Sequence, residues 1–118
     1  MGKVAVLIFA DSETHADMGR MSNALEIVKE FQDAGDETKL IFDGAGTTWV
    51  GKLANKDHSL HRLYESVRGN ISGACSYCAK AFGVKEEVQK AGIPLLSDFE
   101  GHPSARKLIV AGYQIITL

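Results

Sequence analysis

An unbroken apolar segment near the start of the chain limits the folds open to it. Residues 3–10 read Lys-Val-Ala-Val-Leu-Ile-Phe-Ala, nearly all apolar and strand-forming. A continuous run of this kind is typical of a strand covered on both faces, as in a parallel sheet. The segment therefore predicts a buried parallel strand, and other layers of structure must cover it.

A helix is expected directly after this strand. Thr14 followed by Asp17 resembles a helix start, and Gly35 provides a C-terminal stop. Between them, apolar residues recur at helical spacing, namely Met18, Met21, Leu25 and Val28. The first strand and this helix form one strand–helix unit.

Strand-like and helix-like segments alternate along the rest of the chain. Further strands are expected at residues 38–42, 70–74, 93–96 and 113–118. Expected helical segments are a stretch broken near 55–57 and ending at Gly69, two short helices at 78–82 and 84–91, and a last helix opened by Pro103 and ended by Gly112. This alternation predicts a three-layer α/β/α fold with a mostly parallel five-stranded sheet. The 118 residues suit one domain, 1–118.

Charge and hydropathy exclude two classes of partner. The 13 basic and 15 acidic residues give a net charge of −2 without a basic cluster, so nucleic-acid binding is not expected. No apolar stretch approaches the roughly 20 residues that span a bilayer, and no signal peptide is recognisable, so no membrane is expected and the cytoplasm is the expected compartment. Two cysteines three residues apart do not suit a structural disulfide in that compartment.

The cysteine pair is the strongest functional signal. Cys75 is expected where a strand ends and a helix begins, and free N–H groups and the helix dipole favour a thiolate there. A thiolate can act as a nucleophile or carry sulfur. Cys78 follows three residues later on the same helix face, where it could resolve a disulfide or accept a sulfur. The alternative is that both are small core residues, although polar Ser76 and Tyr77 argue against this for Cys75.

A thioredoxin-like redox protein is a possible source of the Cys-x-x-Cys spacing. The pair comes late, after two strand–helix units, and has no tryptophan before it and no proline inside it. The single tryptophan, Trp49, is far away in the sequence. These features argue against a thioredoxin fold.

Ligands of parallel sheets collect at the carboxyl ends of the strands. Four loops are expected there: residues 11–15, 43–48, 75–78 and 97–102. Asp11, His15, Gly44 and His102 are therefore candidate substrate-binding residues. Both histidines are expected in loops, where either could carry a proton or bond to a thiolate, although surface or capping roles are an alternative.

Metal and cofactor sites are not indicated. His58 and His61 have a metal-like spacing, but no second cluster accompanies them, and a solvated helix face explains the pair. Gly44-Ala45-Gly46 matches a dinucleotide fingerprint only weakly, and a tight turn explains it as well. We therefore expect neither a bound metal nor a cofactor.

From Cys75 onward the chain resembles the DsrE/DsrF-like proteins, small proteins of sulfur relay and sulfur oxidation. The matching stretch runs from Cys75 through Cys78 to Gly83-Val84, and the closing Gly112-Tyr113-Gln114-Ile115-Ile116 is similar to the family's last strand. The first strand, the long first helix and the Phe42-Asp43-Gly44 turn also fit. The resemblance implies a three-layer fold, trimers or hexamers, and sulfur carried as a persulfide on Cys75. Cys78 departs from the general pattern.

Three functional hypotheses follow. The first is a sulfur carrier or sulfurtransferase that passes sulfane sulfur between donor and acceptor proteins through a Cys75 persulfide. The second is a thiol–disulfide redox protein or sensor that uses Cys75 and Cys78. The third is a non-catalytic module that binds a small ligand or a partner.

Overall fold

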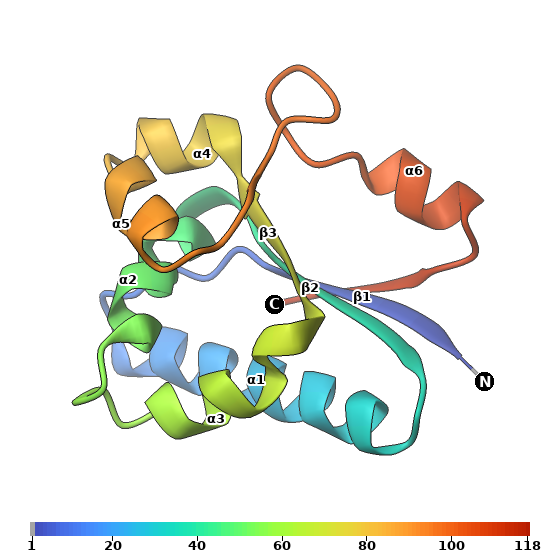
Figure 1. The fold of residues 1–118 in the computed structure, drawn as a ribbon, viewed down its shortest axis with the longest axis horizontal. Helices are drawn as coiled ribbons and strands as arrows, with labels where there is room; N and C mark the ends of the chain where they lie inside the picture. Colours follow the sequence, from blue (N-terminus) through green and yellow to red (C-terminus); the bar gives the residue numbers. More distant parts are fainter. Residues whose placement is uncertain (1) are drawn as a thin grey trace.

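Five strands form one parallel sheet in the computed structural model, which describes residues 2–118 (Figure 1). The strands are β1 (Lys3–Ile8), β2 (Glu37–Phe42), β3 (Ile71–Cys75), β4 (Leu95–Leu96) and β5 (Gln114–Thr117). They lie in the order β4-β3-β2-β1-β5, and all four pairings are parallel. The expected five-stranded parallel sheet is confirmed.

Helices cover both faces of this sheet, which confirms the three-layer α/β/α architecture. The helices are α1 (His15–Asp33), α2 (Trp49–Ala54), α3 (His61–Val67), α4 (Ser76–Ala81), α5 (Lys85–Lys90) and α6 (Ala105–Val110), with 3₁₀ turns η1 (Gly44–Thr48) and η2 (Arg68–Asn70). One face packs against side chains from α1 to α5, and the other against α6. Figure 1 shows α1 and α3 on one side of the strands and α6 on the opposite side.

The buried first strand divides its side chains between the two cores. Val4, Val6 and Ile8 belong to the larger core, whereas Ala5 and Leu7 belong to the smaller core beneath α6. Successive side chains of a strand point to opposite faces, so an apolar run supplies both cores at once. This double burial explains why residues 3–10 contain no apolar–polar alternation.

The start of α1 follows from local sequence. The Thr14 side chain accepts a hydrogen bond from the Asp17 backbone N–H, and the Asp17 carboxylate accepts one from the Thr14 N–H, at 3.1 and 3.2 Å. This reciprocal capping box satisfies two donors that the helix leaves unpaired. The expected start at Thr14 is confirmed, and Gly35 follows the helix with φ +82°.

Three local expectations differ from the structure. Pro103 does not open the last helix, because Ser104 caps α6 by accepting a hydrogen bond from Lys107 N–H, which places Pro103 before the cap. The strand expected at 93–96 contains only two paired residues, since β4 pairs with β3 only at Ala74 and Cys75. His15 is not in a loop but is the first residue of α1.

The turn after β2 is fixed by a close approach to β1. A Cβ atom on Gly46 would lie 2.1 Å from the carbonyl oxygen of Ile8, so only glycine fits. Asp43 N–H also donates to that oxygen, at 2.9 Å. These contacts hold the start of η1 at the carboxyl edge of the sheet.

Within residues 2–118, no helix has the length and apolarity needed to cross a bilayer.

Candidate functional site

Four side chains from three neighbouring segments meet at the carboxyl edge of the sheet. Asp43 directly follows β2, Cys75 ends β3, Cys78 lies in α4, and His102 lies in the loop after β4. One potential ligand atom from each lies within 4.8 Å of every other. The order β4-β3-β2 brings these segments together, since parallel strands end at one edge. We refer to Asp43, Cys75, Cys78 and His102 as the thiol cluster.

Cys75 is the buried member of the thiol cluster, with no solvent exposure. Its Sγ accepts a hydrogen bond from Cys78 N–H at 3.4 Å and so caps α4. It also lies 3.1 Å from Nδ1 of His102, with the donor set by the imidazole tautomer. Burial raises the pKa of the Cys75 thiol to about 12. Burial therefore disfavours the thiolate expected at Cys75, because loss of water outweighs the one backbone N–H that favours it.

Cys78 is half-buried, so of the two cysteines it is the one with exposed surface. The Cys78 Sγ–H donates to Oδ1 of Asp43 at 3.6 Å, and Sγ lies 4.0 Å from Nδ1 of His102. Both cysteines are free thiols. A reactant arriving from solution therefore meets Cys78 before Cys75.

A tight turn presents His102 to the two thiols. Phe99 and His102 exchange backbone hydrogen bonds of 2.8 Å each, and the residues between them have positive φ, 47° at Glu100 and 83° at Gly101. Positive φ at both central positions defines a type I′ turn. The turn is joined to α4, because Tyr77 N–H donates to Gly101 O at 2.9 Å. The Tyr77 and His102 rings also lie 4.8 Å apart between centroids.

Asp43 was not predicted as a site residue, although the loop that it begins was. Its Oδ1 accepts a hydrogen bond from Gly44 N–H at 2.8 Å, which caps η1. The same oxygen accepts the Cys78 thiol hydrogen. An aspartate after a strand is a common turn residue, so its residue type does not mark Asp43 as a site residue. Only knowledge that β2 lies beside β3 would have pointed to it.

The other predicted substrate-binding residues lie outside the thiol cluster. The Asp11 carboxylate accepts a hydrogen bond from Ser12 N–H, and its carbonyl accepts one from the Trp49 indole, so Asp11 shapes the loop after β1. His15 is exposed on α1 and makes no hydrogen bond to the cluster among residues 2–118. Gly44 is next to Asp43 and contributes its N–H. Of these candidates, only His102 directly contacts a cysteine.

His58 and His61 each use Nδ1 in a hydrogen-bond contact with the protein backbone. Nδ1 of His58 accepts a hydrogen bond from Leu60 N–H at 3.0 Å. Nδ1 of His61 lies 2.7 Å from the carbonyl oxygen of Leu53. The His61 contact connects α2 to the start of α3, and the His58 bond shapes the loop between them, so both imidazoles have a structural role.

Comparison with known proteins identifies a relative. The chain is 36% identical over 117 residues to the uncharacterized protein MJ0733 of Methanocaldococcus jannaschii, covering 98% of this chain and 95% of that one. The chain belongs to the MJ0733 family. No family model matches the sequence.

The fold of this MJ0733-family chain recurs in a solved structure. The conserved protein of unknown function BT1422 from Bacteroides thetaiotaomicron matches 97% of this chain and 94% of its own, with a TM-score of 0.64 at 16% identity. At this identity the likeness shows the fold alone. The chemistry of the thiol cluster must therefore be argued from its own residues.

Proposed function

We propose that this protein is a sulfane-sulfur carrier in which Cys78 first accepts the sulfur as a persulfide. The observation that carries the proposal is the pairing of a half-buried cysteine with a fully buried one, beside an imidazole and a carboxylate. The sequence led us to expect that the donor loads Cys75 first. We propose Cys78 instead, because a donor sulfur cannot reach the fully buried Cys75 directly. The resemblance to DsrE/DsrF-like proteins supports the same chemistry.

The loading step is a transfer between two sulfur atoms. Cys78–SH reacts with a donor persulfide R–S–SH to give Cys78–S–SH and R–SH. The Cys78 sulfur attacks the outer donor sulfur, the donor S–S bond breaks, and the leaving thiolate takes a proton. Asp43 Oδ1, which accepts the Cys78 thiol hydrogen, is placed to hold that proton as the attack begins. No oxidant is needed, because one S–S bond replaces another.

Cys75 is the second position for the sulfur. Transfer of the outer sulfur from Cys78–S–SH to Cys75–SH gives Cys75–S–SH and Cys78–SH. The two Sγ atoms lie within 4.8 Å, and His102 Nδ1 is within 4.0 Å of both. A Cys75 persulfide is therefore the product of internal transfer, and an acceptor protein takes the sulfur through Cys78.

The test is persulfide loading of the reduced, metal-free protein with a small persulfide donor, followed by intact mass. Wild type and Cys75→Ser are expected to gain one sulfur atom, whereas Cys78→Ser is expected to gain none. Cys75→Ser is the matched control, because it makes the same change one helical turn away. Absence of an adduct on wild type, or full loading of Cys78→Ser, contradicts the proposal.

A dithiol–disulfide protein is the second candidate, and the closeness of the two sulfur atoms favours it. It requires that Cys75 and Cys78 lose two hydrogens to an oxidised disulfide partner, which is reduced to its dithiol. A redox titration with glutathione buffers, read by thiol alkylation, tests it. A reversible disulfide near the cytosolic potential supports this function, and free thiols across the whole range of potentials exclude it.

The non-catalytic module makes a different prediction for the cysteine variants. If they keep both sulfur binding and ligand binding, the result supports that module.

We also propose that the protein forms a homo-oligomer, with a trimer or hexamer expected from the resemblance. One face of the sheet is covered by α6 alone, and α6 itself exposes Ile109 and Val110 by 60% and 69%. Parallel sheets are usually covered on both faces, and on this face a single short helix provides the cover. A second copy of the chain is therefore a suitable cover for this face.

A further inference from the structure

We propose that Asp43, Cys75, Cys78 and His102 form a binding site for one Zn²⁺ ion. The site uses the same sulfur atoms as the proposed sulfur carrier, but it does not depend on that function. Sequence spacing gave no sign of it, because the four ligands come from three segments that only the fold brings together.

The donor atoms suit zinc. The thiol cluster offers two sulfur atoms, one imidazole nitrogen and one carboxylate oxygen. Zn²⁺ in proteins takes these three kinds of ligand and is nearly always four-coordinate in closed sites. Hard cations such as Mg²⁺ and Ca²⁺ instead require mainly oxygen ligands, of which the cluster offers a single carboxylate.

The distances suit a tetrahedral ion. Zinc–sulfur bonds of about 2.3 Å and zinc–nitrogen or zinc–oxygen bonds of about 2.0–2.1 Å require ligand atoms separated by roughly 3.3–3.8 Å. In the thiol cluster, Cys75 Sγ and His102 Nδ1 are 3.1 Å apart, Cys78 Sγ and Asp43 Oδ1 are 3.6 Å apart, and Cys78 Sγ and His102 Nδ1 are 4.0 Å apart. No pair exceeds 4.8 Å. Side-chain adjustments of under about 1 Å therefore complete a tetrahedron.

The protein backbone holds the ligands in place before any ion binds. Asp43 caps η1, Cys75 caps α4, and the type I′ turn that carries His102 is bonded to Tyr77 N–H. The contacts that now join the four side chains are hydrogen bonds between potential ligand atoms. Zinc replaces them: Zn²⁺ binds two thiolates, neutral His102 and the Asp43 carboxylate, and the two thiols release two protons. The bound site then carries a charge of −1.

Zinc and sulfur are alternative occupants of this site. Coordination to Zn²⁺ draws electron density from the Cys78 thiolate and lowers its nucleophilicity toward a persulfide donor, and an outer sulfur added to Cys78 changes the ligand that this residue offers to the metal. Zinc binding therefore holds both thiols reduced and unloaded until the metal is removed.

The test is a Zn²⁺ titration of the reduced, full-length protein against a chromogenic chelator, with no sulfur donor present. One Zn²⁺ per chain is expected. Even outer partners of metal ligands contribute roughly 10–100-fold to affinity, so Cys78→Ser, His102→Gln and Asp43→Asn should each weaken binding at least about tenfold. Asn at position 43 keeps an oxygen that can cap η1, so this variant is expected to fold. Matched controls are Asp57→Asn and His15→Gln, which remove exposed groups outside the cluster.

Co²⁺ provides a readout that does not depend on affinity alone. Tetrahedral Co²⁺ bound by two thiolates gives a sulfur-to-metal charge-transfer band, which should fall by about half in Cys78→Ser and remain in Asp57→Asn. The proposal is overturned if the wild-type protein binds Zn²⁺ no more tightly than a nonspecific surface does. It is also overturned if all three ligand variants bind Zn²⁺ as tightly as the control variants. Zinc binding and persulfide loading are measured on separate samples, so either can fail while the other holds.

Discussion

At the scale of single residues, the two cysteines are chemically distinct although they lie one helical turn apart. Cys75 is fully buried and its pKa is raised, whereas Cys78 is only half-buried. In native protein at pH 8, we expect a small alkylating reagent to modify Cys78 at least about tenfold faster than Cys75. Mass spectrometry of partly alkylated protein measures both rates. If both cysteines are alkylated at the same rate in the native protein, and Cys75 reacts as fast there as in urea, then Cys75 is not protected by burial and the prediction is wrong.

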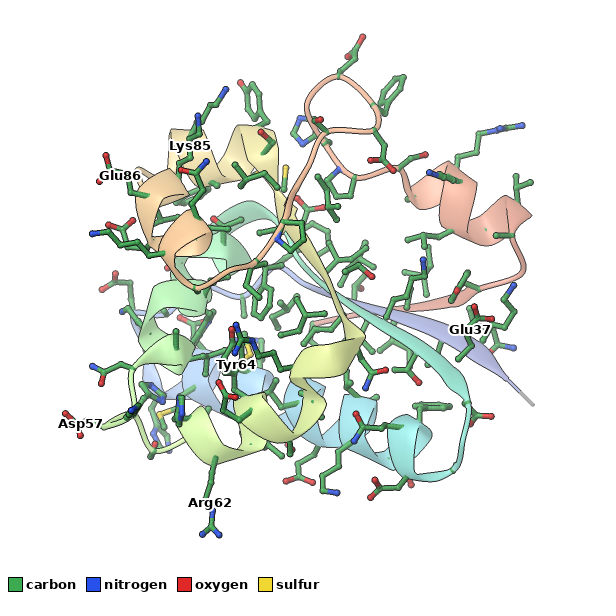
Figure 2. All side chains as sticks on the ribbon, in the orientation of Figure 1. Glu37, Asp57, Arg62, Tyr64, Lys85 and Glu86 are labelled. Carbon is green, nitrogen blue, oxygen red and sulfur yellow. The ribbon has the colours of Figure 1, made fainter. Side chains whose placement is uncertain are left out.

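A second residue-scale prediction concerns Tyr64. Its side chain is 1% exposed and lies between α3 and the sheet (Figure 2), and its hydroxyl has no hydrogen-bond partner among residues 2–118. Burial of an unpaired hydroxyl costs about 1–3 kcal/mol. Tyr64→Phe should therefore raise the free energy of unfolding by about 1 kcal/mol in a urea titration. If Tyr64→Phe instead lowers the free energy of unfolding by more than about 1 kcal/mol, the hydroxyl has a hydrogen-bond partner.

The same variant has a pH signature. Burial raises the pKa of Tyr64 above its ordinary value of 10.0. The folded state therefore keeps a proton that the unfolded state loses, so stability is full below pH 10 and declines as the pH rises above it. The stability gap between Tyr64→Phe and wild type should widen above pH 10 and stay constant between pH 7 and 9. A gap that narrows above pH 10 contradicts the assigned burial.

At the scale of elements, the turn that carries His102 is the least relaxed part of the site. Glu100 is the single non-glycine residue with positive φ among residues 2–118. Asn-Gly is the preferred pair for a type I′ turn, so Glu100→Asn should stabilise the protein by up to about 1 kcal/mol. Thermal unfolding measures the change, with Glu100→Gln as the control that keeps a longer side chain. A destabilised Glu100→Asn variant would mean that the turn has another conformation.

Local elements were predictable from sequence, and so was the edge of the sheet where their loops meet, but not which side chains touch there. The capping box at Thr14 and the strand-to-helix change at Cys75 depend on near neighbours in the chain, and both are confirmed. The α6 start was misassigned, because Pro103 and Ser104 both carry helix-start signals and the hydroxyl cap determines the register. Asp43 and His102 are 59 positions apart in the sequence, so no local pattern marks them as neighbours.

At the scale of the whole molecule, strand order creates the site. β2, β3 and β4 are adjacent, so the segments after them meet, whereas β1 lies on the far side of β2 and the loop of Asp11 meets η1 and α2 instead. Alternation of strands and helices predicts a parallel sheet but does not specify this order. Fold class was therefore predictable, and so were Cys75, Cys78 and His102 as site residues, whereas the membership of Asp43 was not.

The face of the sheet that α6 alone covers gives a prediction at the same scale. If a second copy covers α6, light scattering after size exclusion should give a trimer or hexamer. Replacing exposed Ile109 and Val110 with lysine should shift the mass toward the monomer without unfolding the chain. The control is a double replacement of Lys85 and Glu86 with glutamine, at half-buried and exposed positions of α5 (Figure 2). A wild-type monomer at high concentration contradicts the oligomer.

The central claim is that the thiol cluster takes sulfur through Cys78. Its most direct test is persulfide loading of the metal-free protein followed by peptide mass spectrometry. Trypsin releases both cysteines in one peptide, residues 69–80, so fragmentation between them assigns the adduct. The account predicts that the first sulfur adduct to form is on Cys78 and that adduct on Cys75 follows only when Cys78 is present. A Cys75 adduct that forms at the full rate in Cys78→Ser would contradict it.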